Sequence, residues 1–443
     1  MAQNAQNVVA VLAEIHRLRA MTNSLLNKLS ILELSSADSK RLGIPLGPLR
    51  LQRAWPRSHD CLLIEYAAGN TSIAGQWFAS AKHLQMVLQE TSGSSLQKRQ
   101  KLLELPSIGV MLQADGVDRR LPALASLVAR PDAELVSHRP EERAVVRLEL
   151  SEGLSYAKVL AADRFREFVS TAHSIRKLGG GDFSVPELIR ADLKAGILVF
   201  SALEGQSLHS LLKSQQLIPA ARAAGNALQK LHSVSDSVRS RRRGPSEEIE
   251  TIKFWITQIK SFAPHFFLQV LAAASDVFRP LAADAPAIVL LHGDVYDKQI
   301  FVDTQGRIGF LGFDGLAVGE AALDIANALV HFELRHLQSL LSRAEAMAAA
   351  DAFLDGYQPD PHVQLRIPAY MDAARVRLAC VYAFRPYQSH LVASILSRMG
   401  QQVCHLNTER IQKLGVELLL EKGVRQRPHE NRWKEKAFGR RFI

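Results

Sequence analysis

The sequence predicts an α+β protein with a strand-rich N-terminal half, a helix-rich C-terminal half and an extra helix at the N-terminus. From about residue 45, short apolar alternations broken by proline and glycine indicate strands, as at residues 62–66 and 144–150. After Leu208, apolar residues recur at helical spacing. Because a run of strands precedes a run of helices, we expect a ligand cleft between the two halves.

The composition is that of a folded globular protein. At roughly 150 residues per domain, 443 residues allow two or three domains. The apolar share of 47% and the charged share of 22% exclude a largely disordered chain, a collagen-like repeat and a miniprotein held by disulfides.

Cysteine usage and hydropathy indicate a reducing compartment. The three cysteines, Cys61, Cys380 and Cys404, lie far apart and show no zinc-ligand spacing. The apolar run at residues 8–13 is short and follows no positive charge, so we expect no secretory signal. We also expect no membrane partner, because no stretch of about 18 apolar residues occurs. The expected location is the cytoplasm.

The charge balance raises the question of an anionic partner. Lysine and arginine number 54 against 44 acidic residues, a net charge of +10. Much of the excess lies in residues 239–243 and 422–441. We interpret both as solvated segments rather than nucleic-acid sites, because no zinc-finger spacing, basic-leucine heptad or RNA-binding aromatic motif accompanies them. A basic interaction module remains an alternative.

The elements follow one another in a simple order. Residues 8–34 carry an apolar stripe that predicts a docking helix, with a coiled-coil partner as the alternative. The strands around residues 62–66 and 144–150 have similar neighbourhoods, which allows a diverged hairpin repeat. One strand pair, 288–291 and 300–311, then interrupts the helical half. The expected helices are 217–234, 252–271, 323–341, 344–354 and 369–399.

The most informative segment is residues 289–328. An apolar strand leads into His292-Gly293-Asp294, and a following hairpin returns Asp314 to the same neighbourhood. Two carboxylates and the amide of Gln299 therefore converge. Phosphoryl transfer needs one carboxylate to accept the proton of the attacking hydroxyl, and oxygen ligands to hold Mg²⁺ against the phosphates.

This segment resembles the aminoglycoside phosphotransferase and choline kinase superfamily, the small-molecule relatives of protein kinases. The pattern of that superfamily is His-Gly-Asp, four residues and Asn, and then Ile-Asp-Phe-Asp. This chain has His-Gly-Asp at 292–294, Gln299 at the Asn position and Leu-Gly-Phe-Asp at 311–314. The resemblance implies that Asp294 is the catalytic base, that Gln299 is a metal ligand and that Asp324 supports the loop from behind.

Upstream residues extend the resemblance over roughly residues 135–395. It implies that Lys158 holds the phosphates and that Glu167, on the next helix, holds Lys158 in place. It also implies an interlobe hinge at residues 196–205. There the backbone of Ser201 and Leu203 would meet the adenine edge of ATP, and Phe200 would lie behind it.

Two features depart from the family pattern. Residues 139–143 (Arg-Pro-Glu-Glu-Arg) stand where a glycine-rich phosphate loop is expected, so backbone amides and arginine would make those contacts. Gly312 stands where the family has its metal-binding Asp. We expect Asp314, two residues on, to serve as the substitute metal ligand; a degenerate metal site is the alternative.

The resemblance implies a bilobal, protein-kinase-like fold. It divides the chain into an N-terminal helical extension (1–44), an N-lobe (45–205) and a C-lobe (206–443), with residues 45–134 as additional N-lobe strands. The implied activity is transfer of the γ-phosphoryl group of ATP, with Mg²⁺, to a hydroxyl of a small molecule. A nucleotide- or partner-binding relative without catalysis is the second hypothesis. The basic chain favours a neutral or anionic acceptor over a polycation.

Overall fold

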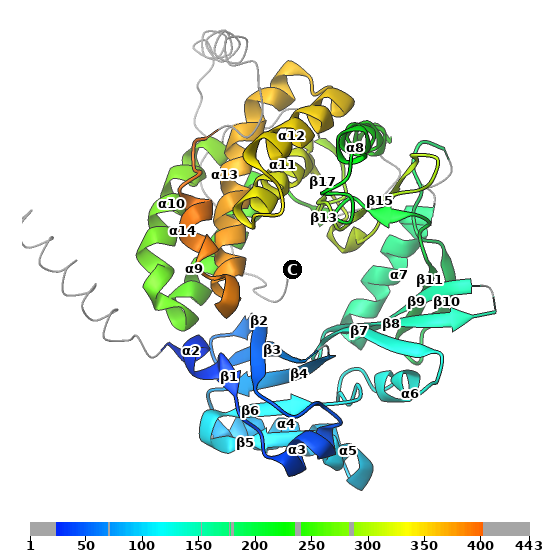
Figure 1. Cartoon of the computed structure of the whole chain (residues 1–443), viewed down its shortest axis with the longest axis vertical. Coiled ribbons are helices and arrows are strands. Elements are labelled where there is room, and N and C mark those ends of the chain that lie inside the picture. Colours follow the sequence, from blue (N-terminus) through cyan, green and yellow to red (C-terminus); the bar gives the residue numbers. More distant parts are fainter. Residues whose placement is uncertain are drawn as a thin grey trace, which may run out of the picture.

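The computed structural model describes residues 24–401 except 70, 152, 177, 179–180, 235–240 and 283–287. It confirms the predicted α+β class: antiparallel sheets make up the first part of the chain, and helices dominate the second (Figure 1). Most of the expected N-terminal helix and the basic tail lie outside the described residues.

The first sheet has six strands in the order β1-β2-β3-β4-β6-β5. Both faces of this sheet are covered, because Cys61 packs with helix α4 while Leu62 and Ile64 belong to the main core of the C-terminal helices. The strands are β1 (Ile31–Leu32), β2 (Leu49–Ser58), β3 (Cys61–Ala68), β4 (Thr71–Phe78), β5 (Leu102–Leu105) and β6 (Val110–Gln113). The helices around them are α2 (Leu25–Leu29), α3 (Ser36–Leu42), α4 (Ala81–Ser92) and α5 (Leu96–Gln100).

The second sheet has five antiparallel strands in the order β10-β11-β9-β8-β7. Its strands are β7 (Ala133–Arg139), β8 (Arg143–Leu150), β9 (Gly153–Leu160), β10 (Leu188–Asp192) and β11 (Ile197–Ser201). Helix α6 (Leu124–Val128) packs against one side, and Phe165 and Phe168 of α7 (Ala162–Arg176) pack on Leu160 and Leu198. The strands of residues 45–134 thus form a sheet of their own and do not extend this one.

The helical half surrounds two small sheets, β12-β15-β16 and β13-β17-β14. Their strands are β12 (Gln206–Ser207), β13 (Arg241–Arg242), β14 (Ile288–Leu291), β15 (Ile300–Val302), β16 (Ile308–Phe310) and β17 (Ala317–Glu320). The helices are α8 (Leu217–His232), α9 (Pro245–Phe262), α10 (Phe267–Leu281), α11 (Ala321–Leu337), α12 (Arg343–Tyr357), α13 (Pro361–Ala383) and α14 (Leu391–Leu396).

Proline explains where two expected helices divide. The helix expected over 252–271 is broken between α9 and α10 at Pro264, and the one over 369–399 is broken before Pro386. Proline cannot donate the backbone hydrogen bond that a continuous helix requires. Helix α11 is buried over nearly its whole length, so it forms the centre of this half. None of the helices in the described part of the chain is long and apolar enough to cross a membrane.

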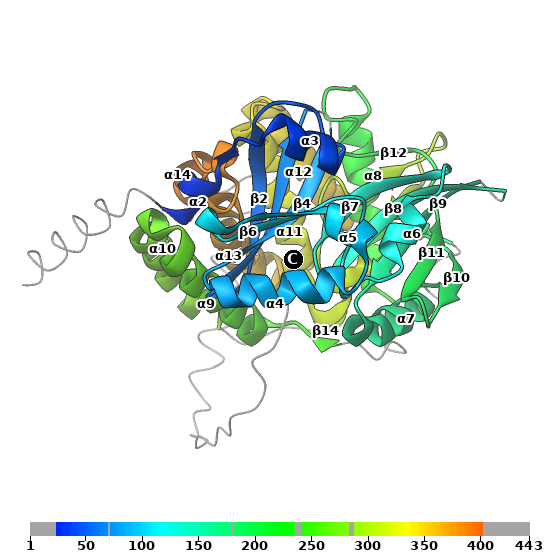
Figure 2. The same ribbon diagram turned by 90° about the horizontal axis from the view of Figure 1, so that it is seen from below.

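The six-stranded sheet contacts both other parts of the molecule (Figures 1 and 2). Toward the helical half, the N–H of Ala54 donates to the carbonyl of Phe384 at 2.9 Å, and Trp77 packs edge-on against Phe262. Toward the five-stranded sheet, Arg57 and Arg119 both pair with the buried carboxylate of Glu141. The six-stranded sheet therefore contacts both the helical half and the five-stranded sheet.

Candidate active site

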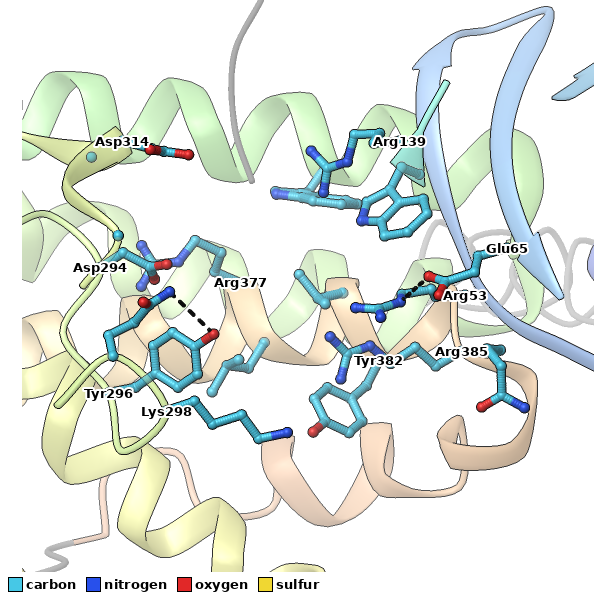
Figure 3. A pocket seen from close by; sticks show the side chains of 18 of the residues that line it. Arg53, Glu65, Arg139, Asp294, Tyr296, Lys298, Asp314, Arg377, Tyr382 and Arg385 are labelled. Carbon is cyan, nitrogen blue, oxygen red and sulfur yellow. Dashed lines mark hydrogen bonds and ion pairs between the residues drawn. The ribbon is translucent and has the colours of Figure 1, made fainter. Parts of the chain in front are cut away.

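A cavity of about 2630 Å³ lies where the three parts meet. Its wall includes Trp55 from the six-stranded sheet, Arg143 from the five-stranded sheet, and Asp294, Asp314 and Arg377 from the helical half. Figure 3 shows Asp294 and Asp314 facing the same space. The convergence of these two carboxylates, expected from the sequence, is thus present in the structure.

The loop that carries Asp294 is fixed from behind by a buried carboxylate. Asp324, near the start of α11, accepts the backbone N–H groups of His292 at 2.8 Å and Gly293 at 2.9 Å. His232, at the end of α8, is hydrogen-bonded to Asp324 at 3.2 Å. Burial would raise the pKa of Asp324, but the hydrogen bonds of His232 and Gly293 hold that pKa below its usual range. Asp324 is therefore placed as the structural acceptor that the sequence indicates.

Gly293 allows the loop to approach the metal-motif segment closely. Its φ is +82°, and a Cβ at this position would collide with the carbonyl of Gly315. His292 is buried and bonded to the carbonyl of Leu311 at 2.7 Å, which ties the loop to the end of β16. The Asp294 side chain is exposed to the cavity. The protein packed around the cavity nevertheless raises the pKa of Asp294, while His292 and Arg377 oppose that shift. A raised pKa makes the carboxylate a stronger base.

Asp314 is held by two cations of the five-stranded sheet. Lys158 on β9 and Arg143 at the start of β8 each form an ion pair with its carboxylate. Burial alone would raise the pKa of Asp314, but these cations lower it strongly. Burial lowers the pKa of Lys158 to about 8, a shift that Asp314 opposes. Lys158 and Asp314 are therefore neighbours, and Arg143, from the segment 139–143 that was expected to contact phosphate, also pairs with Asp314.

Glu167 is placed on α7, beside the apolar stripe of that helix, and is half-buried. The ion pair that the structure gives Lys158 is with Asp314 and not with Glu167. Lys158 also lies over the ring of Phe168, at 4.3 Å from the ring centroid. The proposed support of Lys158 by Glu167 stays a prediction.

The three hinge residues lie at the end of β11, the strand next to β9, and Phe200 packs against the same cluster of α7 as Phe168. Phe200 and Ser201 end β11, and Leu203 follows in the connection to the helical half; they are not among the residues that line the described cavity. The N–H of Ser201 donates to the carbonyl of Glu187 at 2.9 Å. An adenine contact by Phe200, Ser201 and Leu203 therefore stays a prediction.

Gln299 occupies the space beside Gly312. Gly312 has a φ of +78°, and a Cβ at that position would lie 2.5 Å from Oε1 of Gln299. The side chain of Gln299 is one methylene longer than that of the Asn in the family pattern, so its amide oxygen reaches the place where a side chain at position 312 would begin. Gln299 thus brings an oxygen donor to the position that lacks a carboxylate.

Two charged residues near the catalytic loop are buried. The run 239–243 was expected to be solvated, but Arg243 is buried: it donates to the carbonyl of Gly293 and pairs with Glu248 at 3.2 Å. Asp297, within the catalytic loop, is buried as well and accepts two hydrogen bonds from Arg335 at 2.7 and 2.9 Å. The sequence offers one local indication of the Arg243–Glu248 pair, namely that Glu248 follows Arg243 by five residues on the next helix.

The architecture is that of a kinase-like phosphotransferase fold: a five-stranded antiparallel sheet carries Lys158, and a helical half carries the His-Gly-Asp loop. Residues 130–365, more than half of the chain, match the phosphotransferase enzyme family, and the chain belongs to that family. None of the curated proteins compared with this sequence matches it.

Solved structures are similar to this chain at low sequence identity. Amicoumacin kinase hAmiN, in a complex with AMP-PNP, Ca²⁺ and Ami, is 16% identical with a TM-score of 0.50, covering 64% of this chain and 92% of that one. A choline/ethanolamine kinase family protein from Mesorhizobium loti is 16% identical with a TM-score of 0.47, covering 66% and 95% of the respective chains. The aminoglycoside phosphotransferase APH(3'')-Id from Streptomyces rimosus is 18% identical with a TM-score of 0.43, covering 58% and 98%. At these identities the likeness concerns the fold.

Proposed function

We propose that this protein transfers the γ-phosphoryl group of ATP, with Mg²⁺, to a hydroxyl group of a small molecule. The observation that supports this proposal most strongly is the shared cavity of Asp294 and Asp314, with Lys158 bonded to Asp314. In the proposed reaction, the carboxylate of Asp294 accepts the proton of the acceptor hydroxyl. The hydroxyl oxygen forms a bond to the γ-phosphorus as the bond to the β-phosphate oxygen breaks, and ADP leaves.

The residues beside Gly312 fit Mg²⁺ in the chemistry of their donors. Among the described residues, no three His, Cys, Asp or Glu side chains form a metal-binding group. Mg²⁺ does not require one, because it is usually bound by one or two protein oxygen ligands together with phosphates and water. Gln299 and Asp314 would supply these oxygens, and the bound ion would neutralise charge on the phosphates. Lys158 and Arg143, which pair with Asp314, would bind phosphate oxygens.

ATP titration with and without Mg²⁺ tests the proposal. We expect the unfolding temperature to rise with ATP, and to rise further with Mg²⁺, because a ligand at 100 times its Kd stabilises the folded state by about 2.7 kcal/mol. Differential scanning fluorimetry measures the shift, with AMP as the control that lacks the β- and γ-phosphates. A shift that ignores Mg²⁺ would favour the nucleotide-binding relative with a degenerate metal site, which Gly312 supports. The absence of any shift in the unfolding temperature would contradict nucleotide binding. The basic interaction module would then be the hypothesis that still stands.

The Gly312→Asp variant tests whether the native metal site lacks a ligand. We expect it to bind Mg²⁺ and ATP more tightly than the native chain, because it restores the carboxylate of the family pattern. The new Cβ meets the flexible end of Gln299, so the double variant with Gln299→Asn should gain more than the single one. Both carry a backbone cost of roughly 1 kcal/mol for a side chain at positive φ.

Gly312→Ala is the matched control, because it carries the same backbone cost without a carboxylate. The measurement is the Mg²⁺ concentration that gives half-maximal stabilisation of the ATP complex. If the Asp and Ala variants respond to Mg²⁺ equally, the native ligand set is already sufficient and the expected deficiency is absent.

A further inference from the structure

The end of the cavity away from Asp314 carries two cations without a carboxylate partner among the described residues. Lys298 lies in the catalytic loop four residues after Asp294, and Arg385 follows the end of α13. In Figure 3 both side chains face the space below Arg53, and Asp294 lies between Asp314 and Lys298. The two cations are thus reached from the side of Asp294 opposite the expected phosphate site.

Two carboxylates of this region have other partners. Asp297, beside Lys298 in sequence, accepts two hydrogen bonds from the Arg335 guanidinium and is also bonded to His209. Glu65 of the six-stranded sheet pairs with Arg53 at 2.6 Å. Neither carboxylate is therefore available to neutralise Lys298 or Arg385.

Both cations are accessible from the cavity. Lys298 is exposed and Arg385 is half-buried, and both line the cavity wall. Burial together with the nearby Arg53 lowers the pKa of Arg385. The Arg385 guanidinium lies 4.6 Å from the centroid of the Tyr382 ring, which holds it toward the cavity. Tyr382 is itself fixed by a hydrogen bond from Gln338 at 2.8 Å. An anion placed here would meet preformed donors.

We propose that the phosphoryl acceptor is a hydroxyl compound that also carries an anionic group, and that Lys298 and Arg385 bind this group. The proposal rests on the proposed phosphotransferase function and names its substrate class. With the anionic group at these two cations, the hydroxyl of the acceptor would face Asp294. Arg53 and Trp55 of the six-stranded sheet would form the opposite wall. A polycationic acceptor would meet like charge at the same position.

Sulfate binding to the double variant Lys298→Gln/Arg385→Gln tests the anion site without any need for turnover. We expect isothermal titration of the native chain to show a sulfate-binding component that weakens at least about tenfold in the variant, since hydrogen bonds to charged groups contribute about 1.5–3 kcal/mol. The control is Lys194→Gln/Arg279→Gln, which removes one lysine and one arginine from exposed positions outside the cavity. Any sulfate bound near Lys158 contributes equally to the native chain, the double variant and the control, because all three keep Lys158. It therefore does not affect the comparison.

ATP consumption with anionic, neutral and cationic hydroxyl compounds tests the acceptor class. We expect turnover in the anionic set, and a KM for the acceptor raised at least about tenfold in the Lys298/Arg385 variant with little change in kcat, because the lost contact binds the acceptor before and during the reaction. The single variants Lys298→Gln and Arg385→Gln give the same readout if the double variant is too unstable.

The outcomes separate this inference from the proposed function. Equal sulfate binding by the double variant and its control would overturn the anion site. Turnover of neutral acceptors with an unchanged KM in the variant would also overturn it, while the phosphotransferase function would stand. Loss of the sulfate component without turnover of any compound would support the anion site and contradict the phosphotransferase function.

Discussion

Replacing Asp294 by asparagine is expected to reduce phosphoryl transfer by a factor of about 10² to 10⁴, the usual contribution of a general base. Asparagine keeps the shape of the side chain but cannot accept the proton of the acceptor hydroxyl. Asp294 is exposed to the cavity, so the fold should not change. The measurement is acceptor-dependent ATP consumption at saturating ATP.

Nucleotide binding provides the internal check on this variant. Because Lys158, Arg143 and Asp314 are untouched, the stabilisation by ATP should remain close to that of the native chain. Asp276→Asn, on the exposed face of α10, is the matched control for the loss of one negative charge. Native turnover by the Asp294 variant would rule out this residue as the base.

Replacing Asp324 by alanine is expected to lower the free energy of unfolding by about 2–6 kcal/mol, because at least two buried donors lose their acceptor. The change leaves the buried N–H groups of His292 and Gly293 without their acceptor, and His232 without one of its partners. Each unsatisfied buried group costs about 1–3 kcal/mol. Urea denaturation measures the difference.

The Asp355→Ala variant is the control for Asp324→Ala. Asp355 forms an exposed ion pair with Arg222 at 3.1 Å on the surface of α8 and α12, and such pairs contribute about 0–1 kcal/mol. Asp324→Asn should lie between the two, because it keeps one carbonyl oxygen for the loop. An Asp324→Ala loss no larger than that of the control would show that the loop does not depend on this carboxylate.

The sequence was sufficient to predict residues whose positions follow from local patterns. The strand before His292 and the hairpin before Asp314 bring Asp294 and Asp314 to one place, since both segments are short and regular. Lys158 reaches them because it lies in the middle of a strand. In the chain order of the family, this strand comes before the hinge and the His-Gly-Asp loop. Register and chain order therefore determine most of the candidate site.

The sequence could not show contacts that depend on which distant elements become neighbours. Arg143 and Asp314 are 171 residues apart, and no periodicity records their pairing. The alternation at residues 62–66 indicates a strand but does not say to which sheet that strand belongs. The charge run 239–243 is typical of solvent-exposed chain, yet Arg243 finds its partners in Glu248 and in the backbone of the catalytic loop.

The contacts of the six-stranded sheet with both other parts limit how the active site can widen. A bilobal protein joined only at a hinge can open like a clamshell. Here Ala54 and Trp77 anchor the sheet to the helices, and Arg57 anchors it to the other sheet through Glu141. Opening would have to break one of these anchors, so the width of the cavity is set by the position of the six-stranded sheet.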